Sequence, residues 1–212
     1  MVAMQHRRKA THAPAPSTTP APPERDEAEV DPADLLERTW VAVRLAGFRA
    51  EVVEGHIIVS PWAARRHAQV VDRLVEQLFD VKRANGWEFY QSWAVHIPPH
   101  RGDKRLPDLM VAPPDSPEYD ENQAYGDGVL LVTEVVSKFS AEDDFENKPD
   151  EYARAGVPLL LVIDSESEKQ TVTLFSDPGE HGYANRLTVA AGDPLPLPEP
   201  FDLELDTAAL LP

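Results

Sequence analysis

No cysteine occurs among the 212 residues, which excludes disulfide bonds and zinc sites built on cysteine. The absence is consistent with a reducing compartment, and we expect a cytoplasmic protein. No apolar run reaches the roughly 20 residues that a membrane-spanning helix needs. The basic residues Arg7, Arg8 and Lys9 have no hydrophobic segment behind them, so they do not begin a secretory signal. We therefore expect no membrane partner.

Basic residues are scarce, because 20 Lys and Arg stand against 37 Asp and Glu, a net charge of −17. That balance disfavours loose, sequence-independent binding to nucleic acid, which relies on a basic surface. The charge is uneven: residues 64–105 carry eight Lys and Arg against five acids, and residues 115–151 carry twelve acids against two lysines. The acids either solvate loops or hold a metal, and the charge pattern by itself favours solvation.

Composition divides the chain into three parts. Residues 1–30 are rich in proline and alanine with almost no apolar bulk, which predicts a disordered leader. Residues 31–192 contain the periodic segments of one folded domain. Residues 193–212 predict a proline-rich acidic tail, with an edge segment over 201–205 as an open alternative.

Helical and strand periodicities alternate through the domain, with a long acidic loop expected over 113–128. The pattern predicts helices over 32–45, 63–83 and 148–155, hairpins over 48–59 and 171–189, and strands over 87–90, 93–97, 106–111, 129–136 and 159–163. This order predicts a mixed sheet flanked by helices.

The buried strand predicted over 129–136 carries a carboxylate, Glu134. Burying an unpaired carboxylate costs several kcal/mol, or else the group becomes neutral. A sequence that keeps such a charge supplies it with a cation, a metal or a chemical role. The alternative is that the strand has already reached solvent at position 134.

Asp108 and Lys148 stand on either side of Glu134 in the sequence. A Pro-Asp pair is common in turns, but Asp108 precedes an apolar strand here. Two carboxylates at neighbouring strand ends suit a hard divalent cation such as Mg²⁺. A lysine beside them can orient a water or neutralise a developing oxyanion. The trio is the minimum set for metal-assisted phosphodiester cleavage. Most lysines are surface charges, so Lys148 gains its weight only from the order Pro-Asp, strand with Glu, Lys within about forty residues.

Several motifs together resemble the Uma-type family of putative restriction endonucleases, within the PD-(D/E)XK nuclease superfamily. The motifs are Glu54-Gly55-x-Ile57-x-Val59-Ser60-Pro61, His67, Leu106-Pro107-Asp108, Glu134-Val135-Val136-Ser137, Asp144 and Lys148-Pro149-x-x-Tyr152-Ala153-x-Ala155-Gly156-Val157-Pro158. The resemblance runs from about Asp31 to Phe175. It implies an α/β fold with a restriction-endonuclease-like core: a mixed central sheet flanked by helices, an N-terminal β-hairpin and added C-terminal strands.

The resemblance also implies the residues of the site. Asp108 and Glu134 would hold Mg²⁺ or Mn²⁺, with the backbone carbonyl of Val135 completing the ligand set. Lys148 would be the catalytic lysine, displaced onto a helix. Glu54 would be an additional acidic ligand or orienting residue.

Two further positions complete what the resemblance implies. The superfamily's usual lysine position falls at 136, where this chain has Val136. His67 is expected to be a helix-start or structural residue.

We therefore expect a metal-dependent endonuclease that hydrolyses phosphodiester bonds of DNA. The alternative is a catalytically silent nuclease-fold protein that acts as a binding or regulatory module. A hydrolase of a smaller phosphoester, and an interaction protein that works through its leader, also stay open. A double-strand cutter usually needs two active sites, so a homodimer is one expected form.

Overall fold

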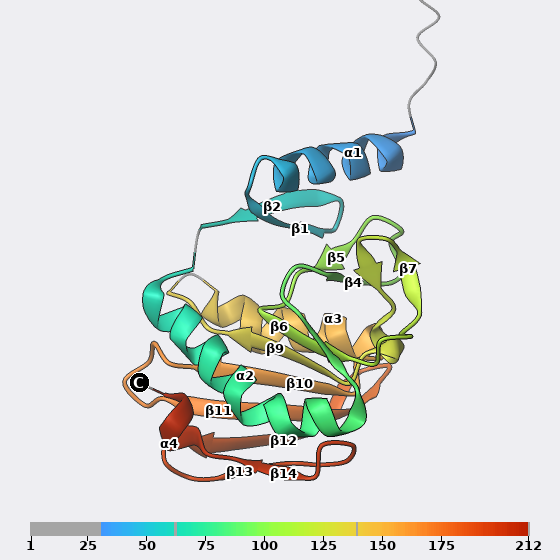
Figure 1. Ribbon diagram of the computed structural model, residues 1–212. Coiled ribbons are helices and arrows are strands. Elements are labelled where there is room, and N and C mark those ends of the chain that lie inside the picture. Colours follow the sequence, from blue (N-terminus) through green and yellow to red (C-terminus); the bar gives the residue numbers. More distant parts are fainter. Residues whose placement is uncertain (1–30, 62, 139, 212) are drawn as a thin grey trace, which may run out of the picture. The chain divides into compact units, whose positions relative to one another are not determined.

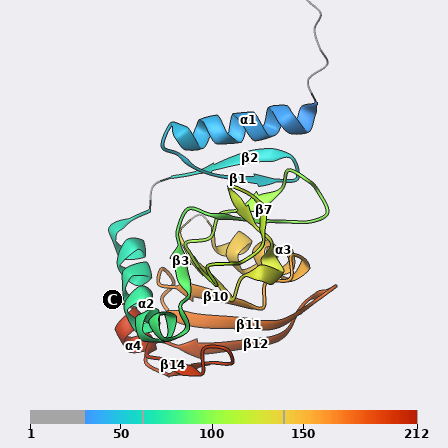
Figure 2. The ribbon, with the colours of Figure 1, turned by 45° about the vertical axis from the view of Figure 1, so that its right-hand side comes forward.

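The computed structural model describes residues 31–61, 63–138 and 140–211. The leader that we expect over residues 1–30 lies outside them. From Asp31 onward the chain forms one compact unit (Figures 1 and 2). Within this described part of the chain, no helix combines the length and apolarity that crossing a membrane requires.

The first of two six-stranded sheets, here sheet 1, has the strand order β12-β11-β10-β9-β6-β3. Its strands are β3 (Glu88–Tyr90), β6 (Leu109–Ala112), β9 (Leu131–Val135), β10 (Leu159–Asp164), β11 (Thr171–Gly179) and β12 (Gly182–Ala190). The β9–β10 pair is parallel and the other pairs are antiparallel, so the sheet is mixed, as predicted. Every residue of β9 is buried, which confirms the central strand that its apolar run predicts.

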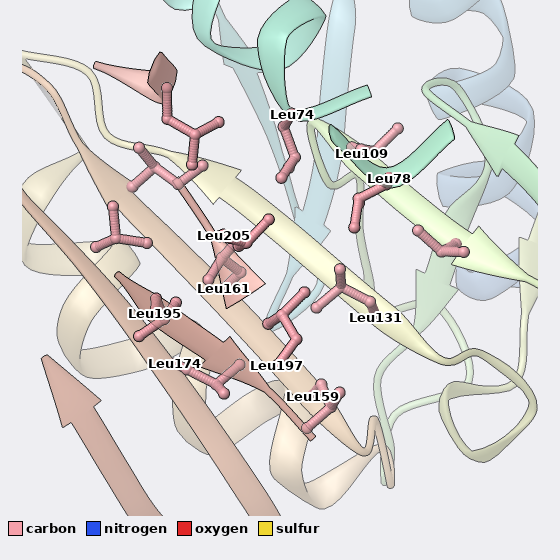
Figure 3. Close-up of a cluster of buried hydrophobic side chains, with 14 of the residues drawn as sticks. Leu74, Leu78, Leu109, Leu131, Leu159, Leu161, Leu174, Leu195, Leu197 and Leu205 are labelled. Atoms are coloured by element: carbon pink, nitrogen blue, oxygen red, sulfur yellow. The ribbon is translucent and has the colours of Figure 1, made fainter. Parts of the chain in front are cut away.

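Helix α2 (Arg65–Asn85) covers one face of sheet 1 (Figure 1). Its apolar stripe packs into a leucine-rich core against the sheet, as Figure 3 shows for Leu74 and Leu78 beside Leu131 and Leu161. The helix ends where the sequence predicts, because Gly86 adopts the left-handed conformation (φ 71°) that an L-residue rarely takes.

The C-terminal segment closes the same core. Where the sequence predicts a proline-rich tail, the chain forms β13 (Leu195–Leu197), β14 (Leu203–Leu205) and α4 (Thr207–Leu210). Strand β14 lies within the edge segment over 201–205 that was the open alternative. Alternate leucines of the hairpin point into the core and leave the prolines and acids outside. Gln77 of α2 holds the segment, because its side chain exchanges hydrogen bonds of 2.8 and 3.0 Å with the backbone of Asp206.

The opposite face of sheet 1 packs against α3 (Lys148–Arg154) and a second sheet, sheet 2. Sheet 2 has the order β2-β1-β5-β4-β8-β7. Its strands are β1 (Arg49–Val53), β2 (His56–Ser60), β4 (Ala94–His96), β5 (Lys104–Arg105), β7 (Glu118–Asp120) and β8 (Gln123–Ala124). The last two fall in the expected acidic loop, which also holds the 3-10 helix η1 (Gly126–Gly128), and β5 is a further strand beyond the predicted set.

Helix α1 (Pro32–Leu45) packs on sheet 2 through Trp40, whose Nε1 donates to the Ala50 carbonyl at 2.8 Å. Asp31 caps the helix by accepting from the Ala33 N–H, so the predicted start is confirmed. The β1–β2 hairpin follows at the predicted place, with Glu54 and Gly55 in its turn. The fold therefore brings the N-terminal hairpin to the same side of sheet 1 as α3.

Candidate active site

Strand alternation turns Glu134 toward α3. Its neighbours Val132 and Val136 belong to the core on that face, and Glu134 lies between them, 2% exposed. Two side chains of α3 meet its carboxylate. The Tyr152 hydroxyl donates to Oε1 at 2.7 Å, and the Lys148 Nζ lies 2.8 Å from Oε2. Glu134 is thus a buried carboxylate with partners, and its strand has not reached solvent.

Asp108 lies immediately before β6, the strand that pairs with β9. Its backbone N–H donates to the Thr133 carbonyl, and its Oδ2 accepts from the Val135 N–H at 2.7 Å. Its Oδ1 lies 3.0 Å from Nη2 of Arg49 and 3.1 Å from Nε2 of His67. These bonds hold the Asp108 carboxylate against the backbone that directly follows Glu134.

Lys148 reaches the same point from the start of α3. A π-helical turn, η2 (Asp143–Asn147), leads into that helix, and such turns are frequent at functional sites. Besides Glu134, the Lys148 Nζ contacts Oδ1 of Asp144 at 2.8 Å, and the Ser140 hydroxyl donates to the other Asp144 oxygen. The fold therefore brings Lys148 directly onto Glu134, with Asp108 bonded to the residue that follows. We call these three residues with Asp144 the Lys148 cluster.

The carboxyl groups of the Lys148 cluster differ in acidity. Burial raises the pKa of Glu134 to about 8; Lys148 opposes this shift, whereas Asp108 and Asp144 reinforce it. For Asp108 burial also raises the pKa, but His67 and Arg49 outweigh it, so the pKa lies below its ordinary value. Burial lowers the pKa of Lys148, and its facing carboxylates more than reverse the effect, so the lysine stays protonated.

A second group of buried charges surrounds Arg105 of β5, and we call it the Arg105 cluster. Its Nη1 donates to Glu51 of β1 at 3.0 Å and to Oδ2 of Asp143 at 2.8 Å. Its Nη2 donates to the other Asp143 oxygen at 3.0 Å, so the contact between Arg105 and Asp143 is bidentate. Its Nε donates to Glu151 of α3. Burial lowers the pKa of Arg105, but the contacts to these acids, Glu151 first, raise it overall.

Both clusters line a cavity of about 880 Å³ between sheet 2, the start of α2 and the end of β9. Ile58 and Val59 of β2 give it an apolar wall, and the exposed Lys138 lies on its rim. Glu54 also lines the cavity, but it is exposed in the hairpin turn. Its backbone N–H donates to Asp103. The acid of the hairpin that bonds to the buried Arg105 is Glu51.

Sequence reasoning assigned no role to Arg49, Glu51 or Tyr152. Arg49 and Glu51 alternate with the buried apolar residues of β1, so their spacing already placed two charges on one face of the strand. Tyr152 lies within the motif that carries the family resemblance, four residues after Lys148 and therefore on the same helix face. His67, expected to be structural, contacts Asp108.

Asp108 and Glu134 offer carboxylate oxygens, the ligand type that a hard divalent cation prefers, and each of these oxygens already contacts a group of the protein. Six carboxylates lie in the two clusters: Glu51, Asp108, Glu134, Asp143, Asp144 and Glu151. Three arginine and lysine side chains face them: Arg49, Arg105 and Lys148. No group of three or more His, Cys, Asp or Glu suited to a metal occurs within 31–61, 63–138 and 140–211. A site made of only two carboxylates and one carbonyl would leave most ligand positions of a cation such as Mg²⁺ to water.

The chain belongs to the Uma2 family, described as putative restriction endonuclease, whose family model matches residues 34–209. The match includes β13, β14 and most of α4, so the C-terminal segment is part of the family's domain. The fold is similar to the 1.96 Å crystal structure of a putative nuclease belonging to DUF820 from Anabaena variabilis ATCC 29413. The TM-score is 0.58 at 16% identity, over 76% of this chain and 88% of that chain. No curated protein matches. The family is thus one of putative restriction endonucleases, and the fold is similar to that of a protein described as a putative nuclease.

Proposed function

We propose that this protein is a metal-dependent endonuclease that hydrolyses phosphodiester bonds of DNA. The observation that carries the proposal is the contact of the Lys148 Nζ with buried Glu134 at 2.8 Å, beside a second buried carboxylate, Asp108, that bonds to the Val135 N–H. All of these groups line one cavity. Membership in a nuclease family supports nucleic acid as the substrate.

Asp108, Glu134 and the carbonyl of Val135 would hold Mg²⁺ or Mn²⁺. When bound, such a cation supplies a Lewis acid that activates a water and stabilises charge on the phosphate. The protein holds both carboxylates in place: the Tyr152 hydroxyl and Lys148 orient Glu134, and the Val135 N–H orients Asp108. These contacts fix the donor oxygens before substrate arrives.

Lys148 would orient the attacking water and offset the negative charge that develops on the phosphate. Its position is defined by two carboxylates, Glu134 and Asp144, at 2.8 Å each. Ser140 in turn donates to Asp144 at 2.6 Å, so the lysine is held from both sides. A protonated amine held in this way is a donor, and it can take the water's proton only after it has released its own.

The chain has a net charge of −17, which repels DNA, but the cavity offers cations for its phosphates. Lys138 is exposed on the rim, Arg49 is 29% exposed in the cavity, and Arg65 is exposed at the first turn of α2 beside the lining residue Ala64. A few such contacts predict weak binding that falls with salt concentration.

The second candidate is a silent nuclease-fold protein that binds without cutting. It is favoured by the contacts of Asp108, whose Oδ1 is already shared by Arg49 and His67. In a silent protein these ion pairs would be permanent replacements for a metal. In an active one they would loosen when the metal binds.

The test is a cleavage assay on supercoiled and single-stranded DNA with Mg²⁺ or Mn²⁺. We expect cleavage by the wild type and its loss in Asp108→Ala and Lys148→Ala. The matched controls Asp115→Ala and Lys169→Ala remove exposed charges outside the cavity and should cut normally. Equal cutting by all five proteins would refute the site, and no cutting by a folded wild type would favour the silent candidate.

A further inference from the structure

Strand β2 (His56–Ser60) is an outer strand of sheet 2, at the rim of the cavity. Its only partner among the described residues is β1. In an antiparallel ladder every second residue turns its N–H and C=O away from the partner strand. The outer edge of β2 therefore presents backbone donors and acceptors that another strand could bind.

The four outer strands of the two sheets differ in charge. Suppose that each strand paired antiparallel with the same strand of a second copy, with the two middle residues opposite each other. In β7 this pairing would place Glu118 opposite Asp120, and in β12 it would place Arg186 opposite Arg186, so like charges would face each other. Strand β3 has three residues, one of them Glu88. Strand β2, His-Ile-Ile-Val-Ser, carries no acidic or basic residue besides its terminal histidine. For a chain of net charge −17, β2 is the edge where self-pairing meets the least repulsion.

Three exposed apolar side chains lie at this edge: Ile58 and Val59 on β2, and Phe48 directly before β1. Eight large hydrophobic residues are exposed among the described residues, and five of them lie between positions 35 and 59: Leu35, Leu45, Phe48, Ile58 and Val59. Exposed apolar side chains that lie together at a strand edge are typical of protein–protein contacts. Phe48 directly precedes β1, whose first residue, Arg49, pairs with Ser60 at the end of β2. The apolar surface is thus next to the open edge.

We propose that β2 pairs antiparallel with β2 of a second copy of this chain, about a two-fold axis at Ile58. Ile58 then lies opposite Ile58 of the partner subunit, and Ile57 opposite Val59 of the partner subunit. The uncharged pairs at the centre are self-complementary, which is what a two-fold contact requires. The partner is a second copy because the same short strand satisfies both sides of the ladder.

The proposed β2–β2 contact would lie beside the cavity. Ile58 and Val59 line it, so the added strand borders both cavities of the dimer. Two sites related by a two-fold axis would match the two strands of a DNA duplex. This arrangement does not depend on the proposed cleavage chemistry, and each can fail alone.

The absence of cysteine permits a direct test of the register. Directly opposed residues of an antiparallel pair have Cα atoms about 4.5–5.5 Å apart, within the range of roughly 4.4–6.8 Å for a disulfide. Full-length Ile58→Cys should therefore form a disulfide-linked dimer on mild oxidation. Val59→Cys should link far more slowly, because two copies of residue 59 are offset by two positions and stand diagonally, about 7–8 Å apart. Leu187→Cys, exposed on β12, is the control for random collision.

Sedimentation of the wild type gives the second measurement. We expect a dimer, and we expect Val59→Lys to shift it to the monomer. A wild type that sediments as a monomer would overturn the proposal. A dimer in which Ile58→Cys links no faster than Leu187→Cys would overturn it as well, because another surface or another part of the chain would then make the contact. DNA cleavage enters neither measurement.

Discussion

The Arg105 cluster and the Lys148 cluster lie side by side and line the same cavity, yet their charges are satisfied differently. Arg105 reaches its three carboxylates through separate N–H groups of one planar fork. Lys148 has one nitrogen, which Glu134 and Asp144 share. Accordingly the pKa of Asp143 is lowered, mainly by Arg105 acting against burial, whereas burial raises the pKa values of Glu134 and Asp144.

This difference separates a structural network from a candidate site. Burial of charge is common to both clusters, so it does not by itself indicate catalysis. In the Lys148 cluster, Glu134 and Asp144 are buried and share one cation, whereas Asp108 has Arg49 and His67. Carboxyl groups that are short of positive charge bind either a proton or a metal, and this property supports the proposed site at Glu134 and Lys148.

The largest expected effect is on folding, when the cation of the structural network is removed. Arg105→Met leaves Glu51 and Glu151 without their guanidinium partner, and breaking a buried ion pair in this way costs about 3–5 kcal/mol. Urea unfolding should show this loss of unfolding free energy. Arg154→Met, which removes an exposed arginine of α3, is the matched control and should change it little. A small effect at Arg105 would remove the contrast between the clusters.

Replacing the cation of the Lys148 cluster by methionine should reduce activity more than it reduces stability. Lys148→Met is expected to reduce cleavage at least about 100-fold, as loss of a donor at a reacting phosphate does. Its unfolding free energy should fall less than that of Arg105→Met, because Glu134 and Asp144 can take up protons once the lysine is gone. An equal loss of stability at both positions would make Lys148 a structural residue.

A third prediction concerns pH in metal-free buffer. Burial raises the pKa of Glu134 from its ordinary 4.5 to about 8, so the folded protein holds a proton that the unfolded chain releases. This contribution to stability is complete below pH 4.5 and is lost as the pH rises through 8. The slope is at most about 1.4 kcal/mol per pH unit. Unfolding with EDTA should show it in the wild type, and Glu134→Gln should lack it. Parallel pH profiles would contradict the raised pKa.

The smallest effect is expected at Glu54, which the family resemblance assigns to the site. Its side chain is exposed in the hairpin turn, where solvent and salt screen its charge. Glu54→Gln should change cleavage by less than about threefold. Glu51→Gln, made in parallel, should lower stability because it weakens the Arg105 cluster. A large loss of cleavage in Glu54→Gln would show that the turn closes over the substrate.

Local patterns were enough to predict much of the fold and the burial of Glu134 in the candidate site. A carboxylate inside the apolar run of β9 identified Glu134, because strand alternation and burial act on neighbouring residues. Helices α1 and α2 were predicted from apolar spacing together with Asp31 and Gly86 at their ends. These signals are readable because each arises within a few residues of sequence.

Contacts between distant segments were not predictable in the same way. Arg49 meets Asp108 only because the hairpin folds back over sheet 1, and no local periodicity encodes that pairing. The C-terminal segment was predicted as a tail because its prolines and acids dominate its composition. Only the alternation of Leu195 with Leu197, and of Leu203 with Leu205, indicates two short strands.

Calorimetric titration with Mg²⁺ tests the central claim most directly, because it measures the metal site without requiring a substrate. We predict binding by the wild type, loss of binding in Asp108→Asn, and retained binding in Glu54→Gln. Binding that is unchanged by Asp108→Asn, or no binding by a folded wild type, would contradict the assignment of Asp108 and Glu134 as metal ligands.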